Sequence, residues 1–303
     1  MAKDEGVERP PSIERLIVEL RPRLHKYCAR MVGSVVDGED VVQEALLKAI
    51  EAIAGHSDVA NPERWLIRIA HNAAIDFLRR RTRDAARHEG TDKDLEMIAD
   101  PGAAADRSQI AAASLRSFIR LPVPQRSSVV LMDVLGYSLQ EIEGMTGMTI
   151  PAIKAALHRG RVRLREISGE PDDYIPPSLS EADRTRLAAY ASRFNARDFV
   201  AVREMLTEEV RLEMVATARL TGRDRVTEAY FGNYGRRRDW QLAPGVVDGR
   251  PAVLVMDGTD LSEKPVYFIL LEWRDSLITK IRDFSHARYA IDGAQILLDQ
   301  GSL

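Results

Sequence analysis

The sequence contains a single cysteine, Cys28, among its 303 residues. One cysteine cannot form an internal disulfide, and no CxxC pair offers the spacing of a zinc or redox site. No run approaches the ~18 apolar residues of a membrane-spanning helix, and the polar N-terminus lacks the apolar segment of a signal peptide. These absences favour a protein of the reducing cytoplasm without membrane contact, and we expect no metal ion and no other cofactor.

The overall charge gives no sign of an acidic partner. Lys and Arg number 43 against 46 Asp and Glu, a formal net charge of −3, and 45% of the residues are apolar. These values are ordinary for a globular protein, and a chain of this length can form about two or three domains. The basic residues are unevenly spread, however, and they cluster in two predicted helices.

Residues 12–83 predict a compact helical unit, preceded by a polar tail at 1–11 that we expect to be disordered. In the first helix Pro22 should cause a kink or a restart, and Gly33 closes the segment. The next helix begins near Asp37, which we expect to be its N-cap. Its apolar side is formed by Val41, Ala45, Ala49 and Ile53, and its outer side carries Asp40, Gln43, Glu44, Lys48 and Glu51.

A third helix, over 64–83, follows a polar loop at 55–62 and ends in a run of arginines. Its apolar stripe comprises Leu66, Ala70, Ala73 and Phe77, and the edge of the core should hold Trp65, Ile69, Asn72 and Asp76. The outer face is expected to carry Arg64, Arg68 and His71, then Arg79, Arg80, Arg81 and Arg83. This pattern fits a nucleic-acid contact. A solvent-exposed basic face, whose charges interact favourably with the C-terminal end of the helix dipole, would give the same pattern.

Residues 84–108 differ in composition from their neighbours. Seven acidic residues stand against three basic ones, together with Pro101, Gly102 and several alanines. This segment predicts a flexible acidic linker.

Residues 109–168 predict a second helical unit that ends in a helix-turn-helix. Ser138 and Glu141 form a capping box, Gly147 marks the turn, and Thr149 caps the last helix, which tolerates Pro151 in its first turn. The N-terminal residues of that helix could reach base edges in a major groove: Thr149, Ala152, Lys154 and Ala155. Basic residues dominate its other faces and suit phosphates: His158, Arg159, Arg161 and Arg163.

After a proline-rich, acidic linker at 169–179, residues 180–303 predict an α+β domain. One or two helices at 180–206 and another at 222–234 accompany strands at 209–216, 239–247, 250–257, 265–273 and 277–285. Turns at Asp248–Gly249 and Asp275–Ser276 join strands into hairpins. A curved antiparallel sheet is therefore expected.

Blocks in both helical units resemble the extracytoplasmic-function (group IV) sigma factors of bacterial RNA polymerase. The likeness to sigma region 2 lies in DGEDVVQEALLKAI followed by WLIRIAHNAAIDFLRRR, and that to region 4 in LPVPQRSSVVLMDVLGYSLQEIEGMTGMTIPAIKAALHRGRVRLRE. The third unit resembles the SnoaL-like, NTF2-fold extension of a subset of these proteins, the sigma J-like group. That likeness lies in FNARDFVAVREMLTEEVRLEM and YFILLEWRDSLITKIRDFSHARYAI.

The resemblance implies binding to core RNA polymerase, at its β′ clamp and β flap, and to promoter DNA. The clamp would contact Asp40, Gln43 and Glu44. The −10 element would be engaged by the loop at 55–62 and by Arg64, Trp65, Arg68, His71, Asn72, Arg79, Arg80 and Arg81, although Trp65 and Asn72 could instead support the helix from within. The −35 element would be read by Thr149, Ala152, Lys154, Ala155, His158, Arg159, Arg161 and Arg163. The acidic linker would thread toward the polymerase active-site and RNA-exit channels, and the third unit would regulate activity.

Two other functions fit parts of the sequence. A helix-turn-helix regulator with a ligand-binding domain leaves residues 12–83 unexplained. An NTF2-fold isomerase or hydrolase would need an acid or base in a cavity, with Asp257, Asp260, Asp283 and His286 as candidates and Tyr230, Tyr234 and Trp240 as cavity walls. No spacing singles out an acid–base pair among them. We therefore expect that the protein is not an enzyme. A small-molecule ligand, if there is one, is expected to bind to the third unit without being converted.

Overall fold

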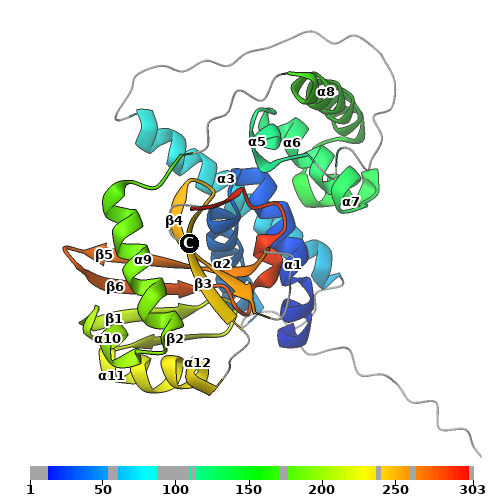
Figure 1. Cartoon of the computed structure of the whole chain (residues 1–303). Helices are drawn as coiled ribbons and strands as arrows, with labels where there is room; N and C mark the ends of the chain where they lie inside the picture. Colours follow the sequence, from blue (N-terminus) through cyan, green and yellow to red (C-terminus); the bar gives the residue numbers. More distant parts are fainter. Residues whose placement is uncertain are drawn as a thin grey trace, which may run out of the picture. The chain divides into compact units, whose positions relative to one another are not determined.

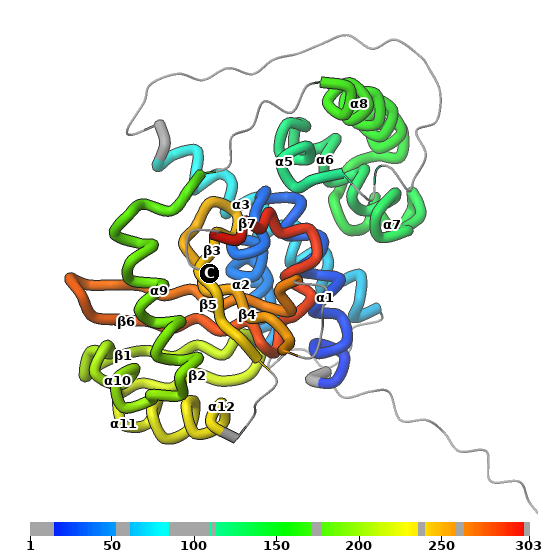
Figure 2. The backbone as a smooth tube through the Cα atoms, in the orientation of Figure 1, coloured from blue at the N-terminus to red at the C-terminus, as the bar shows by residue number. Residues whose placement is uncertain are grey.

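The computed structural model describes residues 13–53, 61–86, 110, 113–170, 177–236, 240–258 and 264–299. The chain divides into two compact units, Met1–Pro171 and Asp172–Leu303, which run from blue to green and from green to red in Figure 2. The border lies within the linker predicted at 169–179. The predicted tail at 1–11, most of the loop at 55–62 and most of the acidic linker lie outside the described residues.

The described part of the first unit is helical (Figure 1). It contains α1 (Ile13–Val32), α2 (Val35–Ile53), α3 (Pro62–Ala86), α5 (Leu115–Ile119), α6 (Val123–Val129), the π-helical turn η1 (Val130–Val134), α7 (Leu139–Thr146) and α8 (Ile150–Gly169). One hydrophobic core joins α1–α3 to α5–α8: Leu24, Met31 and Leu66 from the first set belong to the same cluster as Phe118 and Leu131. The two predicted helical units therefore pack together as one body.

α1 continues through Pro22, where the sequence predicts a kink or a restart. Pro22 is exposed, and Val18, whose carbonyl loses its helical partner to the proline, is 72% exposed. Because water can hydrate a carbonyl on this side, the missing hydrogen bond does not stop the helix. Gly33, with a φ of +84°, follows the end of α1 as predicted.

Ser34, and not Asp37, is the N-cap of α2. The backbone N–H of Asp37 donates to the Oγ of Ser34 at 3.3 Å, so Asp37 lies in the first turn. Gly38 lets α2 approach α1, since a Cβ at this position would lie 2.7 Å from the backbone of Ala29. The predicted apolar side is buried at Val41, Ala45 and Ala49.

The helix-turn-helix is formed by α7 and α8. Ser138 and Glu141 make the predicted capping box, and Gly147 ends α7 with a φ of +73°, a conformation that favours glycine. Thr149 occupies the N-cap position of α8, but its side chain accepts no capping hydrogen bond. The Oε1 of Glu143 instead accepts from the first backbone N–H of α8 at 3.3 Å.

The second unit is a curved sheet with helices, the α+β organisation that the sequence predicts. Its helical elements are α9 (Glu181–Asn195), α10 (Phe199–Glu204), α11 (Arg223–Val226), the π turn η2 (Thr227–Phe231), α12 (Gly232–Arg236) and the 3-10 turn η3 (Arg288–Ile291). Its strands are β1 (Leu206–Met214), β2 (Ala218–Thr221), β3 (Trp240–Val247), β4 (Arg250–Asp257), β5 (Pro265–Arg274), β6 (Leu277–Asp283) and β7 (Ile296–Leu298). The helix α9 packs on β3 and β4 (Figure 1).

The sheet is mixed, so the prediction of a wholly antiparallel sheet is wrong. The strand order is β2-β1-β6-β5-β4-β3-β7, and β1 pairs with β6 in parallel. A parallel pair joins segments far apart in the chain, which hairpin signals cannot reveal. The strands β2 and β7, of four and three residues, are too short for an alternating pattern to predict them.

Candidate nucleic-acid and polymerase interfaces

α3 exposes a basic surface close to the one predicted. Arg64, Arg68 and Asn72 are exposed at four-residue intervals, and the exposed C-terminal end carries Arg79, Arg80 and Arg81. Trp65 is half-buried and packs against the core. Side chains one turn apart lie on one face of a helix, so this surface could follow a nucleic-acid strand.

His71 does not belong to that surface, and its predicted outward position is wrong. The imidazole is 5% exposed, and its Nδ1 lies 2.6 Å from the hydroxyl of Tyr27 on α1. Burial lowers the pKa of His71 to about 4, so the ring is neutral at pH 7. Burial also raises the pKa of Tyr27, so the hydroxyl keeps its proton in this hydrogen bond. Ile67, His71 and Ala74 form a buried stripe, which the sequence could have revealed had its apolar face been drawn wider.

Three of the exposed arginines form ion pairs inside the first unit, Arg79 with Asp76 on the same helix at 3.9 Å and two with other helices. Arg80 lies 2.6 Å from Glu44 on α2, and Arg64 lies 2.7 Å from Glu141 in the capping box of α7. The hydrogen bond from Arg80 is the main cause of the lowered pKa of Glu44. The predicted DNA surface on α3 is thus continuous with acidic groups on α2 and α7.

The outer side of α2 combines acidic, amide and apolar side chains. Asp40, Gln43 and Glu44 are half-buried. Beside them Leu47 and Ile50 are 54% and 55% exposed, and sequence reasoning did not single out these two apolar residues although they lie at outward positions. Apolar side chains rimmed by polar ones are typical of protein–protein contacts.

The N-terminal part of α8 is open to solvent where base contacts are predicted. Thr149, Ala152 and Lys154 are exposed and Ala155 is half-buried. Further along, Arg159 is exposed, His158 is half-buried, and Arg163 pairs with Glu166 at 2.9 Å. The first two turns of α8 are therefore free of packing on their outer side.

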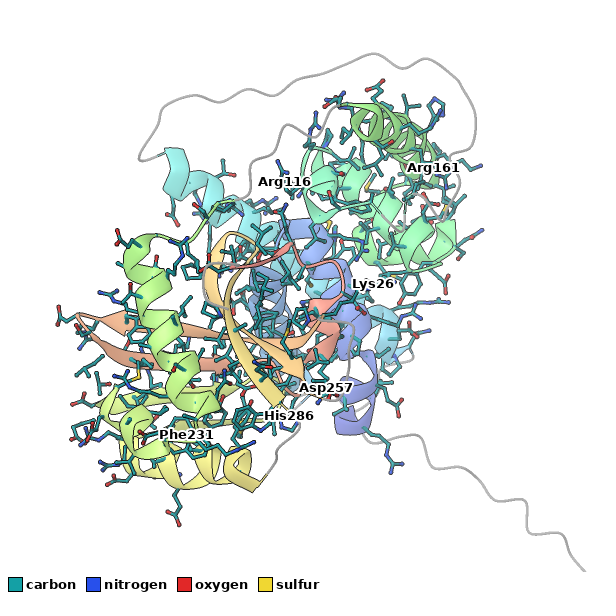
Figure 3. The ribbon with its side chains drawn as sticks, in the orientation of Figure 1. Lys26, Arg116, Arg161, Phe231, Asp257 and His286 are labelled. Carbon is teal, nitrogen blue, oxygen red and sulfur yellow. The ribbon has the colours of Figure 1, made fainter. Side chains whose placement is uncertain are left out.

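Arg161, on α8 (Figure 3), has a structural partner that the sequence did not reveal. Its Nε and Nη2 donate to the two carboxylate oxygens of Asp133 at 2.9 and 2.6 Å. The Asp133 side chain is fully buried in η1. Next to Arg161, Gly160 lets α6 cross α8, because a Cβ there would lie 2.8 Å from Val129. Arg161 is therefore held by Asp133, and we no longer expect it to contact a phosphate.

Buried polar contacts tie α5–α8 to α1–α3. The guanidinium of Arg126 donates to the carbonyl oxygens of Ile119 and Leu121, and also to that of Met31 at the end of α1. Burial lowers the pKa of Arg126 to about 10. The hydroxyl of Tyr137 donates to Glu63 on α3 at 2.6 Å. The contacts of Arg126 with Met31 and of Tyr137 with Glu63 join residues 95 and 74 positions apart, and no local pattern predicts them.

In the second unit Tyr230 and Tyr234 meet at a carboxylate. Both hydroxyls donate to Oδ2 of Asp283, at 2.5 and 2.8 Å, and the Asp283 residue is 0% exposed. Trp240 packs against Tyr234, with ring centroids 5.4 Å apart. The three predicted wall residues therefore lie together in the interior of the unit.

The predicted acid–base candidates do not lie together as the three predicted wall residues do. Asp257, at the end of β4, is half-buried and His286 is exposed (Figure 3). Asp283, in contrast, is buried and accepts hydrogen bonds from two tyrosines. Asp260 lies outside the described residues. In the described part of the chain, no three His, Cys, Asp or Glu side chains group so as to hold a metal ion. None of the described helices combines the length and apolar character that crossing a bilayer requires.

Comparison with known proteins assigns both helical regions. The Sigma-70 region 2 family model matches residues 16–84, and the Sigma-70, region 4 model matches residues 116–164. The ECF RNA polymerase sigma factor SigM of Mycobacterium tuberculosis is 32% identical over 148 residues, which cover 48% of this chain and 72% of SigM. The chain belongs to the extracytoplasmic-function sigma factor family. The family and fold class predicted from the sequence are confirmed.

Two further proteins match a larger share of the chain. The ECF sigma factor SigG of Mycobacterium tuberculosis is 28% identical over 217 residues, 64% of this chain but only 59% of SigG. The match thus spans less than two thirds of that relative. The crystal structure of the Mycobacterium tuberculosis sigma factor SigJ covers 88% of this sigma factor and 94% of its own chain, with 20% identity and a TM-score of 0.35.

Proposed function

We propose that this sigma factor binds core RNA polymerase in the cytoplasm and directs it to specific promoters, where it starts transcription by binding and not by catalysis. The observation that carries the proposal is the presence of regions 2 and 4, in order, in one chain. A helix-turn-helix regulator would account for region 4 alone. Each region also presents exposed basic side chains, on α3 and on α8.

Region 4 would read the −35 element with the N-terminal part of α8. Thr149, Ala152 and Lys154 are exposed at the end of the helix that would enter the major groove. Arg159, one turn further along, would contact a phosphate, which fixes the position of the helix without reading sequence.

Region 2 would bind the −10 element along α3. Arg64, Arg68 and Asn72 would line the single strand, and the arginines at 79–81 would follow its backbone. Positive grooves that track the backbone are typical of proteins that bind unpaired strands. Trp65 is half-buried, so its exposed edge could stack on a base while the rest of the ring supports the helix.

The outer side of α2 would dock on the β′ clamp, and region 4 would contact the β flap. Asp40, Gln43 and Glu44 would supply the polar part of the clamp contact, and Leu47 with Ile50 the apolar part. This combination suits a partner surface that is basic at its rim and apolar at its centre.

The second unit would regulate these activities. Run-off transcription with core polymerase should therefore differ between the full chain and a chain that ends at residue 168. Unchanged transcription from every cognate promoter would contradict a regulatory role.

The promoter function is tested by run-off transcription over a promoter library. Lys154→Ala should change the preference among −35 sequences at one position by about 1–3 kcal/mol, or ~5- to 150-fold. Arg159→Ala is the matched control, because it should weaken all promoters alike and lower the salt dependence by about one phosphate contact. A failure to co-purify with core polymerase, or equal losses on all sequences for both variants, would contradict the proposal.

A further inference from the structure

The helix α8 packs on α6 and buries an apolar stripe that includes Leu157 and Leu164. The two helices approach closely at Gly160, where a Cβ would lie 2.8 Å from Val129 and 3.4 Å from Gln125. Apolar contacts are non-directional, so they hold α8 against α6 but determine its tilt and its rotation only weakly. A directional contact is needed to fix the orientation of the helix.

Arg161, the residue after Gly160, makes such a directional contact. Its Nε and Nη2 donate to Oδ2 and Oδ1 of Asp133 at 2.9 and 2.6 Å. A planar guanidinium that donates two hydrogen bonds to one carboxylate fixes the angle between the two groups as well as their distance. Asp133 lies four residues after Val129, so both contacts with α8 come from one side of the segment formed by α6 and η1.

Burial strengthens the pair of Arg161 with Asp133. The side chain of Asp133 has no exposure and that of Arg161 is 26% exposed, so water competes little for the carboxylate. The hydrogen bond to Asp133 raises the pKa of Arg161, which keeps the guanidinium charged. Hydrogen bonds of charged groups are stronger than neutral ones, and a poorly solvated environment strengthens them further. The orientation of α8 is therefore fixed near the middle of the helix.

The predicted base-reading residues lie away from this pair, at the N-terminal end of α8. Lys154 and Thr149 precede Arg161 by 7 and 12 residues, which is about 10 and 18 Å along a helix. A tilt of ~5° about Arg161 would move them by roughly 1–1.5 Å, more than the ~0.5 Å range of hydrogen-bond distances. Arg159 would move by only ~0.3 Å, because it lies within one turn of Arg161. A tilt of α8 would therefore disturb base contacts but not a phosphate contact of Arg159.

We propose that Arg161 is a positioning residue for recognition of the −35 element, because its two hydrogen bonds with Asp133 fix the orientation of α8 and thereby the base contact of Lys154. Arg161 would then determine sequence preference without touching DNA. The proposal rests on the promoter function proposed above, in which the N-terminal part of α8 reads the −35 element.

Holoenzyme formed from the full chain and core polymerase tests this role. The measured quantity is discrimination: run-off transcription from the preferred −35 sequence, divided by that from a sequence changed at the base pair whose preference Lys154→Ala alters. Arg161→Lys keeps the positive charge but lacks the planar pair of donors. Discrimination should therefore fall about fivefold, the value of one hydrogen bond. Asp133→Asn, which leaves a single acceptor oxygen, should lower it in the same way. In both variants the salt dependence of promoter binding should stay at the wild-type level, because Arg159 keeps its phosphate contact.

Two control variants separate positioning from a general loss of stability. Arg120→Met breaks the exposed ion pair of Arg120 with Glu170, which follows the last residue of α8. Tyr137→Phe removes the hydrogen bond to Glu63 on α3 and should lower the midpoint of urea unfolding. Both controls should keep the discrimination of the wild type.

Several results would overturn the positioning role. One is wild-type discrimination in Arg161→Lys. Another is a fall in Arg161→Lys without a fall in Asp133→Asn, which would show that Arg161 acts on DNA directly. A third is an equal fall in either control, which would show that any weakening of the unit has this effect. If the wild type itself prefers no −35 sequence, the promoter function fails together with the positioning role, whereas a wild-type preference that both variants retain overturns the positioning role alone.

Discussion

The burial of His71 predicts that the first unit loses stability in mild acid. The unfolded chain gains a proton on this histidine below its ordinary pKa of 6.5, but the native state gains it only below about 4. The native state is therefore penalised as the pH falls from 6.5 toward 4, and the contribution is constant above about pH 7. At pH 5 these two values give a loss of about 2 kcal/mol relative to pH 7. Burial also lowers the pKa of His25, which acts in the same direction, so a variant must separate the two.

Cys28 offers an assay that reports on the first unit alone. It is the only cysteine of the chain and is fully buried, so 4,4′-dithiodipyridine, which reacts in mild acid, modifies it only when this unit opens. In His71→Asn the amide group can still form a hydrogen bond with the Tyr27 hydroxyl, but it does not titrate. Between pH 7 and 5 the opening equilibrium should rise by ~20-fold more in the wild type than in His71→Asn, the equivalent of about 2 kcal/mol.

A matched control uses a histidine that the second unit exposes. His286→Asn should keep the full acid dependence of the wild type, because this side chain is exposed and lies in the other unit. If His71→Asn and the wild type show the same change between pH 7 and 5, the buried imidazole is not the source, and the reasoning from its burial is refuted.

Two further predictions concern the buried Arg126 and the half-buried Arg161 of the first unit. Arg126→Met should lower the free energy of unfolding by about 3–5 kcal/mol, because three carbonyl oxygens lose a charged donor. Arg120→Met is the control, because Arg120 forms an exposed ion pair with Glu170. It should lower the free energy of unfolding by less than about 1 kcal/mol. Both values are measured by urea titration, and equal losses would contradict the role of Arg126. Arg161→Met should cost about 2–3 kcal/mol, because the buried carboxylate of Asp133 loses two hydrogen bonds from a charged donor. This variant should also leave the salt dependence of DNA binding unchanged. A smaller salt dependence would show that Arg161 does contact a phosphate.

The sequence was most informative where the signal is local. The capping box of Ser138 and Glu141 and the hairpin at Asp248–Gly249 depend on neighbouring residues, and both are present in the structure. The apolar side of α2 was predicted for the same reason. The errors arise where the partner is distant: His71 is buried by Tyr27, 44 residues away, and the parallel pairing of β1 with β6 joins residues as far apart as Leu206 and Ile278. Hydrophobic periodicity assigns a side chain to one face of a helix or strand, but it does not show which of those faces another segment covers.

The exposure of its carboxylate partner decides whether an arginine of the first unit can be released to contact DNA. The pair of Arg64 with Glu141 leaves the two side chains 50% and 25% exposed, and that of Arg80 with Glu44 leaves them 47% and 31% exposed. Exposed pairs of this kind contribute about 0–1 kcal/mol, so a phosphate could replace either carboxylate at little cost. Arg161 faces a carboxylate with no exposure, and releasing it would remove two charged hydrogen bonds from a buried group, at a cost several times larger. Because Glu141 belongs to region 4 and Arg64 to region 2, a strand that takes Arg64 would also remove one contact between the two regions. Binding of the −10 strand and loosening of the packing between regions 2 and 4 should therefore favour one another.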